Sequence, residues 1–469
     1  MGFDRTGFGE TWQRAFDYVE SRLSGRIVAA QRQARWRPAW FLDVERGGEI
    51  LPIYFRGARP EAEHGVAQLR RECTCLELLE RHDLPVPHVY GFCPRPEGIV
   101  MDRVPGRFNL ATADDEAERV AVRNHYMELL ARVHALPTAD FEAAGMKRPA
   151  DALALARGDL DAWVAAYRSA RTRPEPAIEF TLDWLTRNAP RDRRRVAPLL
   201  GDAGQFLFDR GRVTAILDVE LATLGDPAAD LGALLSRDLS EPLGDLEHAV
   251  RHYEQASGEP VERAVIHYHA VRFGVITPLA TAAMVASPPP VADYVQYLAW
   301  YLVYARCPLE IVAELEGVEI PPPELPAEDG DDPSPYAVAH AALGTRFDGL
   351  ERSDAFQAYR VDALARLASY LRRCDRFGRT LEAADLAEAG ELLGRRPADW
   401  RERDQALEAL VAANRGDRDA GLIRYLVRRL RREEFLLAPV MGELAGARMQ
   451  ILGEPAQPAR SEARSPKDC

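Results

Sequence analysis

The chain of 469 residues is too long for one ordinary domain, since a single domain commonly has about 100–200 residues. Hydrophobic residues make up 47% of it and charged residues 28%, which excludes a disordered or fibrous protein. The net charge of −13 argues against nucleic acid as a partner, because phosphate binding requires a basic surface. Arginine supplies almost all of the positive charge: of the 60 basic residues, only Lys147 and Lys467 are lysines.

The six cysteines are scattered without a C-x-x-C pair, which is typical of proteins in a reducing compartment. Residues 1–25 contain no apolar stretch of the kind found in secretory signals. The apolar stretches 265–286 and 291–305 contain charged or histidine residues, so they are predicted to be core helices and not membrane spans. We therefore expect a cytoplasmic protein without a membrane partner.

The first third of the chain predicts a small antiparallel sheet with one helix packed on it. An N-terminal helical extension (1–24) precedes a lobe of residues 25–105. In this lobe, two β-rich runs between 40 and 55 flank Gly47-Gly48, a hairpin pattern. A helical pattern from 66 to 79 follows, and then short strands at 86–92 and 98–102.

A larger, mainly helical lobe is predicted for residues 106–318. Apolar residues recur at helical spacing in the stretches 116–136, 150–171 and 178–187, and again from about 230 to 316. Between them, residues 205–208 and 213–217 predict a β-hairpin.

The Pro-rich acidic stretch 319–335 predicts a linker. Residues 336–452 predict an all-helical C-terminal domain with breaks at Gly378, 394–397 and Gly416, and residues 453–469 a disordered tail. The run of arginines at 428–432 is typical of a solvated helix face, with anion binding as the alternative. The fold class is therefore α+β, a bilobal unit followed by an all-α C-terminal domain.

Two aspartates at the ends of the 205–217 hairpin provide the clearest chemical pattern. Asp202 precedes the hairpin and Asp218 follows it, so both can face one cleft. One carboxylate in such a pair can accept a hydroxyl proton while the other holds a divalent cation that carries phosphates. Turn capping is the ordinary structural role for aspartates at these positions.

The segment from Gly201-Asp202 through 216–220 to Gly225-Asp226-Pro227 and Asp230 resembles the signature of the aminoglycoside phosphotransferase and choline kinase superfamily. The resemblance covers residues 25–315 and implies a bilobal protein-kinase-like fold that transfers the γ-phosphoryl group of ATP to a small-molecule hydroxyl. It implies Asp202 as the catalytic base and Asp218 as a magnesium ligand. Asp226 and Asp230 are expected to be structural.

The same resemblance assigns residues of the first lobe to the nucleotide. Arg56 takes the place of the phosphate-binding lysine, and Glu72 is expected to pair with it. Arginine suits this place because its planar group can hold two phosphate oxygens at once, and the first lobe contains no lysine. Met101 and Arg103 lie in the segment that resembles the adenine-binding hinge.

Three features depart from the superfamily pattern. Leu200 stands where the superfamily has a histidine. The loop that should carry a second metal ligand is shorter, and Gln205 is the residue nearest to the position of that ligand. The phosphate-covering loop 33–40 has no glycine. Gln205 is thus a candidate metal ligand or a plain loop residue. The aromatic cluster Trp300, Tyr301 and Tyr304 could line an acceptor pocket or pack in the core.

We expect an ATP- and Mg²⁺-dependent small-molecule kinase. Its acceptor would be a hydroxyacyl thioester, an amino alcohol or an aminoglycoside. The alternative is a catalytically weakened kinase fold that binds nucleotide or an acyl ligand as a regulator. The oligomeric state stays open, with a homodimer as a candidate.

Overall fold

The computed structural model describes residue 5 and residues 7–35, 37–58, 65–290, 292–329 and 334–453. The predicted tail lies outside them apart from Gly453, as does part of the predicted linker. The elements of the first lobe follow in chain order: α1 (Glu10–Leu23), β1 (Arg26–Arg32), β2 (Ala39–Arg46), β3 (Glu49–Gly57), α2 (Gly65–Arg81), β4 (Val89–Pro94) and β5 (Glu97–Asp102).

In the described part of this lobe the strands form a five-stranded antiparallel sheet in the order β1-β2-β3-β5-β4. The predicted hairpin is confirmed: Gly47 and Gly48 turn the chain between β2 and β3 with positive φ values of 64° and 88°, which glycine adopts without strain. Apolar residues of α1 and of the sheet form a core of their own. Strand β1 lies in a stretch for which the sequence predicted no strand.

The second lobe is mainly helical, and its elements are α3 (Glu116–His134), α4 (Thr138–Ala143), α5 (Ala152–Arg157), α6 (Leu160–Ala170), α7 (Pro176–Arg187), β6 (Ala197–Leu199), β7 (Phe206–Asp209), β8 (Arg212–Ile216), β9 (Thr223–Gly225), α8 (Pro227–Arg237), α9 (Leu246–Ser257), α10 (Arg263–Ala286) and α11 (Tyr294–Leu315). The β7–β8 hairpin is the predicted one. The short β6–β9 pair is an addition to the predicted elements.

Helix α10 is long and apolar enough, by length and composition alone, to cross a membrane, but most of it is buried within the protein. It packs against α8 and α11, which agrees with its prediction as a core helix.

The C-terminal elements are α12 (Ala337–Asp348), α13 (Ala355–Leu393), α14 (Trp400–Ala413), α15 (Asp419–Leu437), and the 3-10 helices η3 (Ala438–Val440) and η4 (Gly442–Leu444). The predicted break at Gly378 is wrong, because α13 runs through it without interruption. One glycine costs a helix only about 1 kcal/mol, which the contacts of a long helix can offset.

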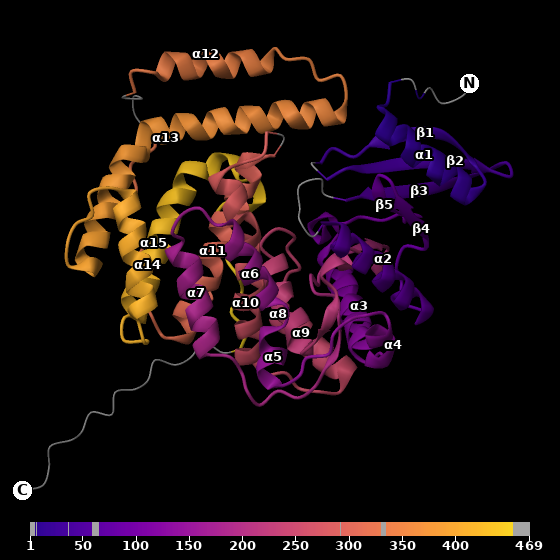
Figure 1. Ribbon diagram of the computed structural model, residues 1–469, viewed down its shortest axis with the longest axis horizontal. Coiled ribbons are helices and arrows are strands. Elements are labelled where there is room, and N and C mark those ends of the chain that lie inside the picture. The colour runs from indigo at the N-terminus through magenta and orange to yellow at the C-terminus, as the bar shows by residue number, and fades with distance from the viewer. Residues whose placement is uncertain are drawn as a thin grey trace, which may run out of the picture.

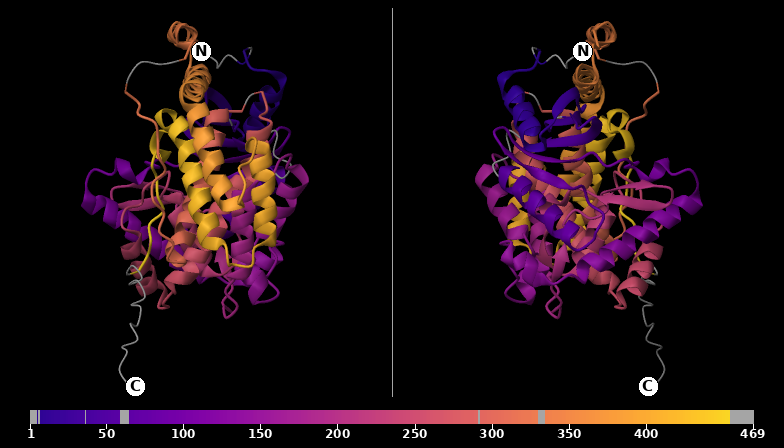
Figure 2. Two further views of the ribbon diagram at one scale, coloured as in Figure 1. Left: turned by 90° about the vertical axis from the view of Figure 1, so that its left-hand side faces the viewer. Right: turned by 90° about the vertical axis from the view of Figure 1, so that its right-hand side faces the viewer.

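The C-terminal helices lie against the second lobe. Helix α15 packs on α11, and apolar residues of both belong to one continuous core. Figure 1 shows α12 and α13 side by side, with the start of α13 pointing toward the sheet of the first lobe. In the side views of Figure 2, α14 and α15 stand beside the second lobe.

Candidate active site

A cavity of about 1430 Å³ extends between the two lobes and the C-terminal helices. Its walls include residues of β3, α2 and β5, the segments around Asp202 and Asp218, helix α11, and residues 439–444. The sequence-predicted site residues all line it: Arg56, Glu72, Met101, Arg103, Asp202, Gln205 and Asp218. Folding thus gathers residues that are up to 162 positions apart into one site.

The predicted ion pair between Arg56 and Glu72 is present. Arg56 Nε donates to Glu72 Oε2 at 2.8 Å, and Arg56 Nη2 also pairs with Asp218. Arg56 is 5% exposed and Glu72 2% exposed, so both charges are held away from bulk water. A buried charge is tolerated when it is paired, and here α2 supplies the carboxylate that holds the guanidinium of β3 in place.

A second arginine enters this cluster from the phosphate-covering loop. Arg37, which is 2% exposed, donates through Nη2 to Glu220 Oε2 at 2.6 Å. Glu220 Oε2 also lies 3.5 Å from Arg56 Nη2. The sequence indicated only that this loop lacks glycine, so Arg37 and Glu220 were missed as site residues.

Glu72, Asp218 and Glu220 form a group of carboxylates that could hold a metal ion, since one oxygen from each lies within 4.8 Å of the others. Three hard oxygen donors suit Mg²⁺, and the two guanidinium groups beside them suit phosphate oxygens. Burial raises the pKa of Glu72 to about 7 even though Arg56 opposes the shift. The donor set therefore fits a divalent cation that carries phosphates.

Asp202 lies across the hairpin from this cluster and has partners of its own. Gln205 Nε2 donates to Asp202 Oδ2 at 2.7 Å, and Arg237 Nε donates to Oδ1 at 3.2 Å. The structure thus brings the amide nitrogen of Gln205 to the carboxylate of Asp202, whereas the sequence left Gln205 open between a metal ligand and a plain loop residue. Burial raises the pKa of Asp202, an effect that Arg237 opposes. Arg237, at the end of α8, was also missed by the sequence analysis.

The carboxylate of Asp230 holds the backbone that precedes Asp202. Its carboxylate accepts hydrogen bonds from the backbone amides of Leu200 and Gly201 at 2.8 and 2.9 Å and contacts His134. Gly201 has a φ of +84°, and a Cβ atom there would lie 2.2 Å from the carbonyl oxygen of Leu221, so only glycine fits. The expected structural role of Asp230 agrees with these contacts.

Asp226 also has structural contacts. It accepts a hydrogen bond from the amide of Ala228 as the N-cap of α8, and it pairs with Arg193. Asp218 itself has a left-handed backbone with a φ of 54°, which aspartate tolerates better than most residues.

The predicted hinge residues line the cavity beyond Arg56. Met101 is buried at the end of β5, and the adjoining Arg103 donates through Nη2 to Asp43 Oδ1 at 2.8 Å. The three aromatic residues at 300–304 do not all line the same cavity. Trp300 and Tyr304 line the cavity, whereas Tyr301 lines a separate small pocket and its hydroxyl bonds to Glu175.

Comparisons with known proteins cover most of the two lobes. Residues 31–272 match the model of the phosphotransferase enzyme family. Acyl-CoA dehydrogenase family member 11 of Rattus norvegicus is 25% identical over 264 residues, which cover 53% of this chain and 33% of that protein. Aminoglycoside 3'-phosphotransferase of Streptomyces fradiae is 28% identical over 246 residues, 49% of this chain and 88% of that one.

The chain therefore spans about a third of the length of the rat relative. Among solved structures, macrolide 2'-phosphotransferase MphH of Brachybacterium faecium aligns with a TM-score of 0.45 and 19% identity, over 59% of this chain and 93% of that one.

Proposed function

Because the chain belongs to the phosphotransferase enzyme family, we propose that it transfers the γ-phosphoryl group of ATP, with Mg²⁺, to a hydroxyl group of a small molecule. The observation that carries this proposal is the buried cluster of Arg37, Arg56, Glu72, Asp218 and Glu220. Its Arg56 and three carboxylates line the same cavity as Asp202.

In this proposal the cluster binds the nucleotide phosphates. Arg56 and Arg37 would release their carboxylate partners and pair with phosphate oxygens, to which a guanidinium can donate two parallel hydrogen bonds. Glu72, Asp218 and Glu220 would hold Mg²⁺, which neutralises phosphate charge when bound. Met101 and Arg103 would contact the adenine.

Asp202 would act on the acceptor. Its carboxylate accepts the proton of the acceptor hydroxyl while the hydroxyl oxygen forms a bond to the γ-phosphorus. The bond from the γ-phosphorus to the bridging oxygen of ADP breaks, and ADP leaves with that electron pair. The raised pKa of Asp202 brings it closer to neutral pH, as a general base requires.

The acceptor class is the finer part of the proposal. The curated relatives are named as acyl-CoA dehydrogenase family members and as an aminoglycoside phosphotransferase, which supports a hydroxyacyl thioester or an aminoglycoside. An amino alcohol is the third candidate.

The direct test measures nucleotide binding and phosphoryl transfer separately. ADP with Mg²⁺ is expected to raise the melting temperature of the wild type but not of Arg56→Ala, and Arg56→Lys is expected to be intermediate because lysine lacks the planar fork. Labelled ATP is expected to transfer its γ-phosphoryl group to an alcohol with the wild type and not with Asp202→Ala. Absence of any ADP effect on the wild type would refute the proposal.

One observation favours the alternative, a kinase fold that binds nucleotide without turnover. Both carboxylate oxygens of Asp202 accept hydrogen bonds from Gln205 or Arg237, which could restrain it from taking a proton. This alternative predicts that ADP stabilises the protein and that the ATP turnover of Asp202→Ala equals that of the wild type.

A further inference from the structure

One end of the cavity is built by residues outside the family match. The matched residues end at 272, yet Thr277, Gln296, Trp300 and Tyr304 of α10 and α11 line the cavity. Arg366 of α13 and the segment 439–444 complete this end. This part of the wall therefore lies beyond the residues that the family model covers.

The segment 439–444 presents a mainly apolar surface. Its members Val440, Met441 and Leu444 line the cavity, and Met441 is 6% exposed. The 3-10 helix η4 packs against α11, which carries Trp300 and Tyr304. An apolar and aromatic wall thus faces the space next to the catalytic loop.

Charged groups lie along the cavity between Asp202 and this segment. Arg237, which bonds to Asp202, lies 3.8 Å from Glu241. Burial raises the pKa of Glu241, and the nearby charges of Asp202 and Glu443 add to the effect although Arg237 opposes it. Glu443, Glu241 and Asp202 all line the same cavity, so a molecule bound in it can meet all three carboxylates.

Buried contacts hold the segment in position on both sides. Before it, Glu434 of α15 accepts a hydrogen bond from Arg306 Nε of α11 at 2.6 Å, with both residues buried. After it, Arg306 Nη2 donates to the carbonyl oxygen of Ala447 at 2.7 Å, and the amide of Leu452 donates to His267 Nε2 at 2.9 Å.

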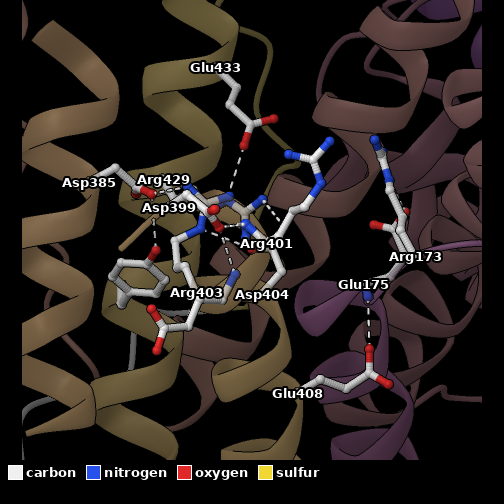
Figure 3. Close-up of polar contacts among 12 residues, drawn as sticks. Arg173, Glu175, Asp385, Asp399, Arg401, Arg403, Asp404, Glu408, Arg429 and Glu433 are labelled. Atoms are coloured by element: carbon white, nitrogen blue, oxygen red, sulfur yellow. Dashed lines mark hydrogen bonds and ion pairs between the residues drawn. The ribbon is translucent and has the colours of Figure 1, made fainter. Parts of the chain in front are cut away.

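Further ion pairs fix α14 and α15 where they meet the second lobe. Figure 3 shows Arg403 between Asp385 and Asp404, with Arg429 bound to Asp404 at 2.7 Å. At the edge of this cluster, Glu408 accepts a hydrogen bond from the amide of Glu175 at 2.9 Å. These contacts join α13, α14 and α15 to one another and α14 to the second lobe.

Helix α13 contacts a residue of each lobe. Near its start, the guanidinium of Arg32 in β1 lies 3.9 Å from the ring centre of Phe356. Farther along, Arg366 Nη2 donates to Asp293, the N-cap of α11. The C-terminal helices therefore span the cavity from one lobe to the other.

We propose that the C-terminal helices form an acceptor subsite, in which Met441 and its apolar neighbours contact the body of an alcohol whose hydroxyl reaches Asp202. Glu443 disfavours an anionic group at this end, and Arg366 does not offset it because Asp293 already neutralises its charge. The subsite selects an alcohol with an apolar segment that is neutral or cationic near Glu443. This inference rests on the proposed phosphoryl transfer and assigns its selectivity to residues beyond 272.

The test compares two methionines of the same C-terminal segment. Met441 lines the cavity, whereas Met449, which is 7% exposed, does not line it and packs against Gly274 of α10. Met441→Ala and Met449→Ala remove the same buried side chain, so similar losses of melting temperature are expected. The panel of acceptors is 3-hydroxyoctanoyl-coenzyme A, choline and kanamycin, assayed with labelled ATP.

Met441→Ala is expected to lower kcat/KM for the preferred acceptor about 10- to 100-fold, as removal of apolar contacts from a substrate pocket does, and to leave the KM for ATP unchanged. Met449→Ala should match the wild type. Glu443→Gln is expected to lower kcat/KM for choline or kanamycin several-fold relative to kcat/KM for the acyl thioester. Glu391→Gln, at the exposed end of α13, is its control.

Equal kcat/KM values for Met441→Ala and Met449→Ala with every acceptor would overturn the subsite and leave the proposed function intact. The subsite is also wrong if the wild type binds ADP but is neither stabilised by any alcohol of the panel nor able to phosphorylate one. If the wild type fails to bind ADP, the proposed function fails first, and the inference falls with it.

Discussion

The two ends of the cavity are built in different ways. At the end that we propose binds the nucleotide, hereafter the nucleotide end, Arg37, Arg56 and three carboxylates form a compact and mostly buried set of charges within the family-matched residues. At the other end, aromatic and aliphatic side chains of α11 and residues 439–444 form a wall outside the match. Charges that bind phosphate can be common to a whole family, whereas a wall that selects an acceptor can be supplied by an added domain.

Asp202, the proposed base, lies where these two ends meet, so its substitution should have the largest effect. Asp202→Asn keeps the size of the side chain but removes the base. We expect phosphoryl transfer to fall by about 10²–10⁴-fold, the range typical of general-base removal. ADP should still raise the melting temperature, because the phosphate cluster is untouched. Loss of ADP binding together with transfer would mean that the two ends are not separable.

The ion pair of Arg306 in α11 with Glu434 in α15 should give the next largest effect, on stability. Glu434→Gln removes one of the two carboxylates that pair with the buried guanidinium of Arg306, the other being Glu310. This should lower the free energy of unfolding by about 2 kcal/mol, the loss of one charge-assisted hydrogen bond. The neighbouring Glu433→Gln is the control, because its partly exposed pair with Arg429 should contribute less than about 1 kcal/mol. Denaturant unfolding measures both.

If the two ends are built separately as described, Glu434→Gln should also change kcat/KM for the acceptors by a larger factor than it changes the KM for ATP. Equal impairment of both would show that the C-terminal helices support the whole cavity and not one end of it.

The anchor of the C-terminal segment at His267 should make stability depend on pH. Burial lowers the pKa of His267 to about 4, and its Nε2 must be unprotonated to accept the amide of Leu452. Between pH 6.5 and 4 the unfolded chain binds this proton and the folded chain does not, so stability falls as the pH is lowered through this range. The loss attributable to His267 is at most about 3 kcal/mol.

His267→Gln is expected to flatten this part of the profile, because glutamine does not titrate. Other buried groups, such as His269 with its pKa lowered by burial to about 3, contribute equally to both proteins. The difference between the two unfolding profiles therefore isolates His267, and identical slopes would show that it does not titrate as described.

The sequence predicted which residues gather at the nucleotide end, but not all of the contacts that those residues make. Asp202, Asp218, Arg56 and Glu72 could be placed because short motifs and strand ends bring them to one cleft. For Gln205 the sequence left a metal ligand and a plain loop residue as alternatives, and in the structure its amide nitrogen donates to Asp202. Loop length alone does not determine which of two nearby carboxylates an amide will contact.

At the other end of the cavity the sequence offered Trp300 and Tyr304 as lining residues only as an alternative to core packing, and the rest of this end depends on how distant helices pack. The arginines at 428–432 were expected to form a solvated face. All four pair instead with acidic groups of other helices: Arg428 with Glu388, Arg429 with Asp404, Arg431 with Glu310, and Arg432 with Glu388 and Asp385. Partner choice between charges on different helices is a tertiary property that helical periodicity does not contain.

Arg37 is the residue through which the nucleotide end can be tested most finely. It comes from a loop without glycine, so backbone amides cannot approach phosphates there as closely as in a glycine-rich loop, and a guanidinium paired with Glu220 lies at this position instead. Arg37→Ala should raise the KM for ATP about tenfold, the effect of roughly one charge-assisted hydrogen bond, and leave the KM for the acceptor unchanged. Arg26→Ala, at the exposed start of β1, is the control. If Arg37 only stabilises the loop, Arg37→Ala will lower the melting temperature without changing the KM for ATP relative to that control, and phosphate binding at this end will depend on Arg56 alone.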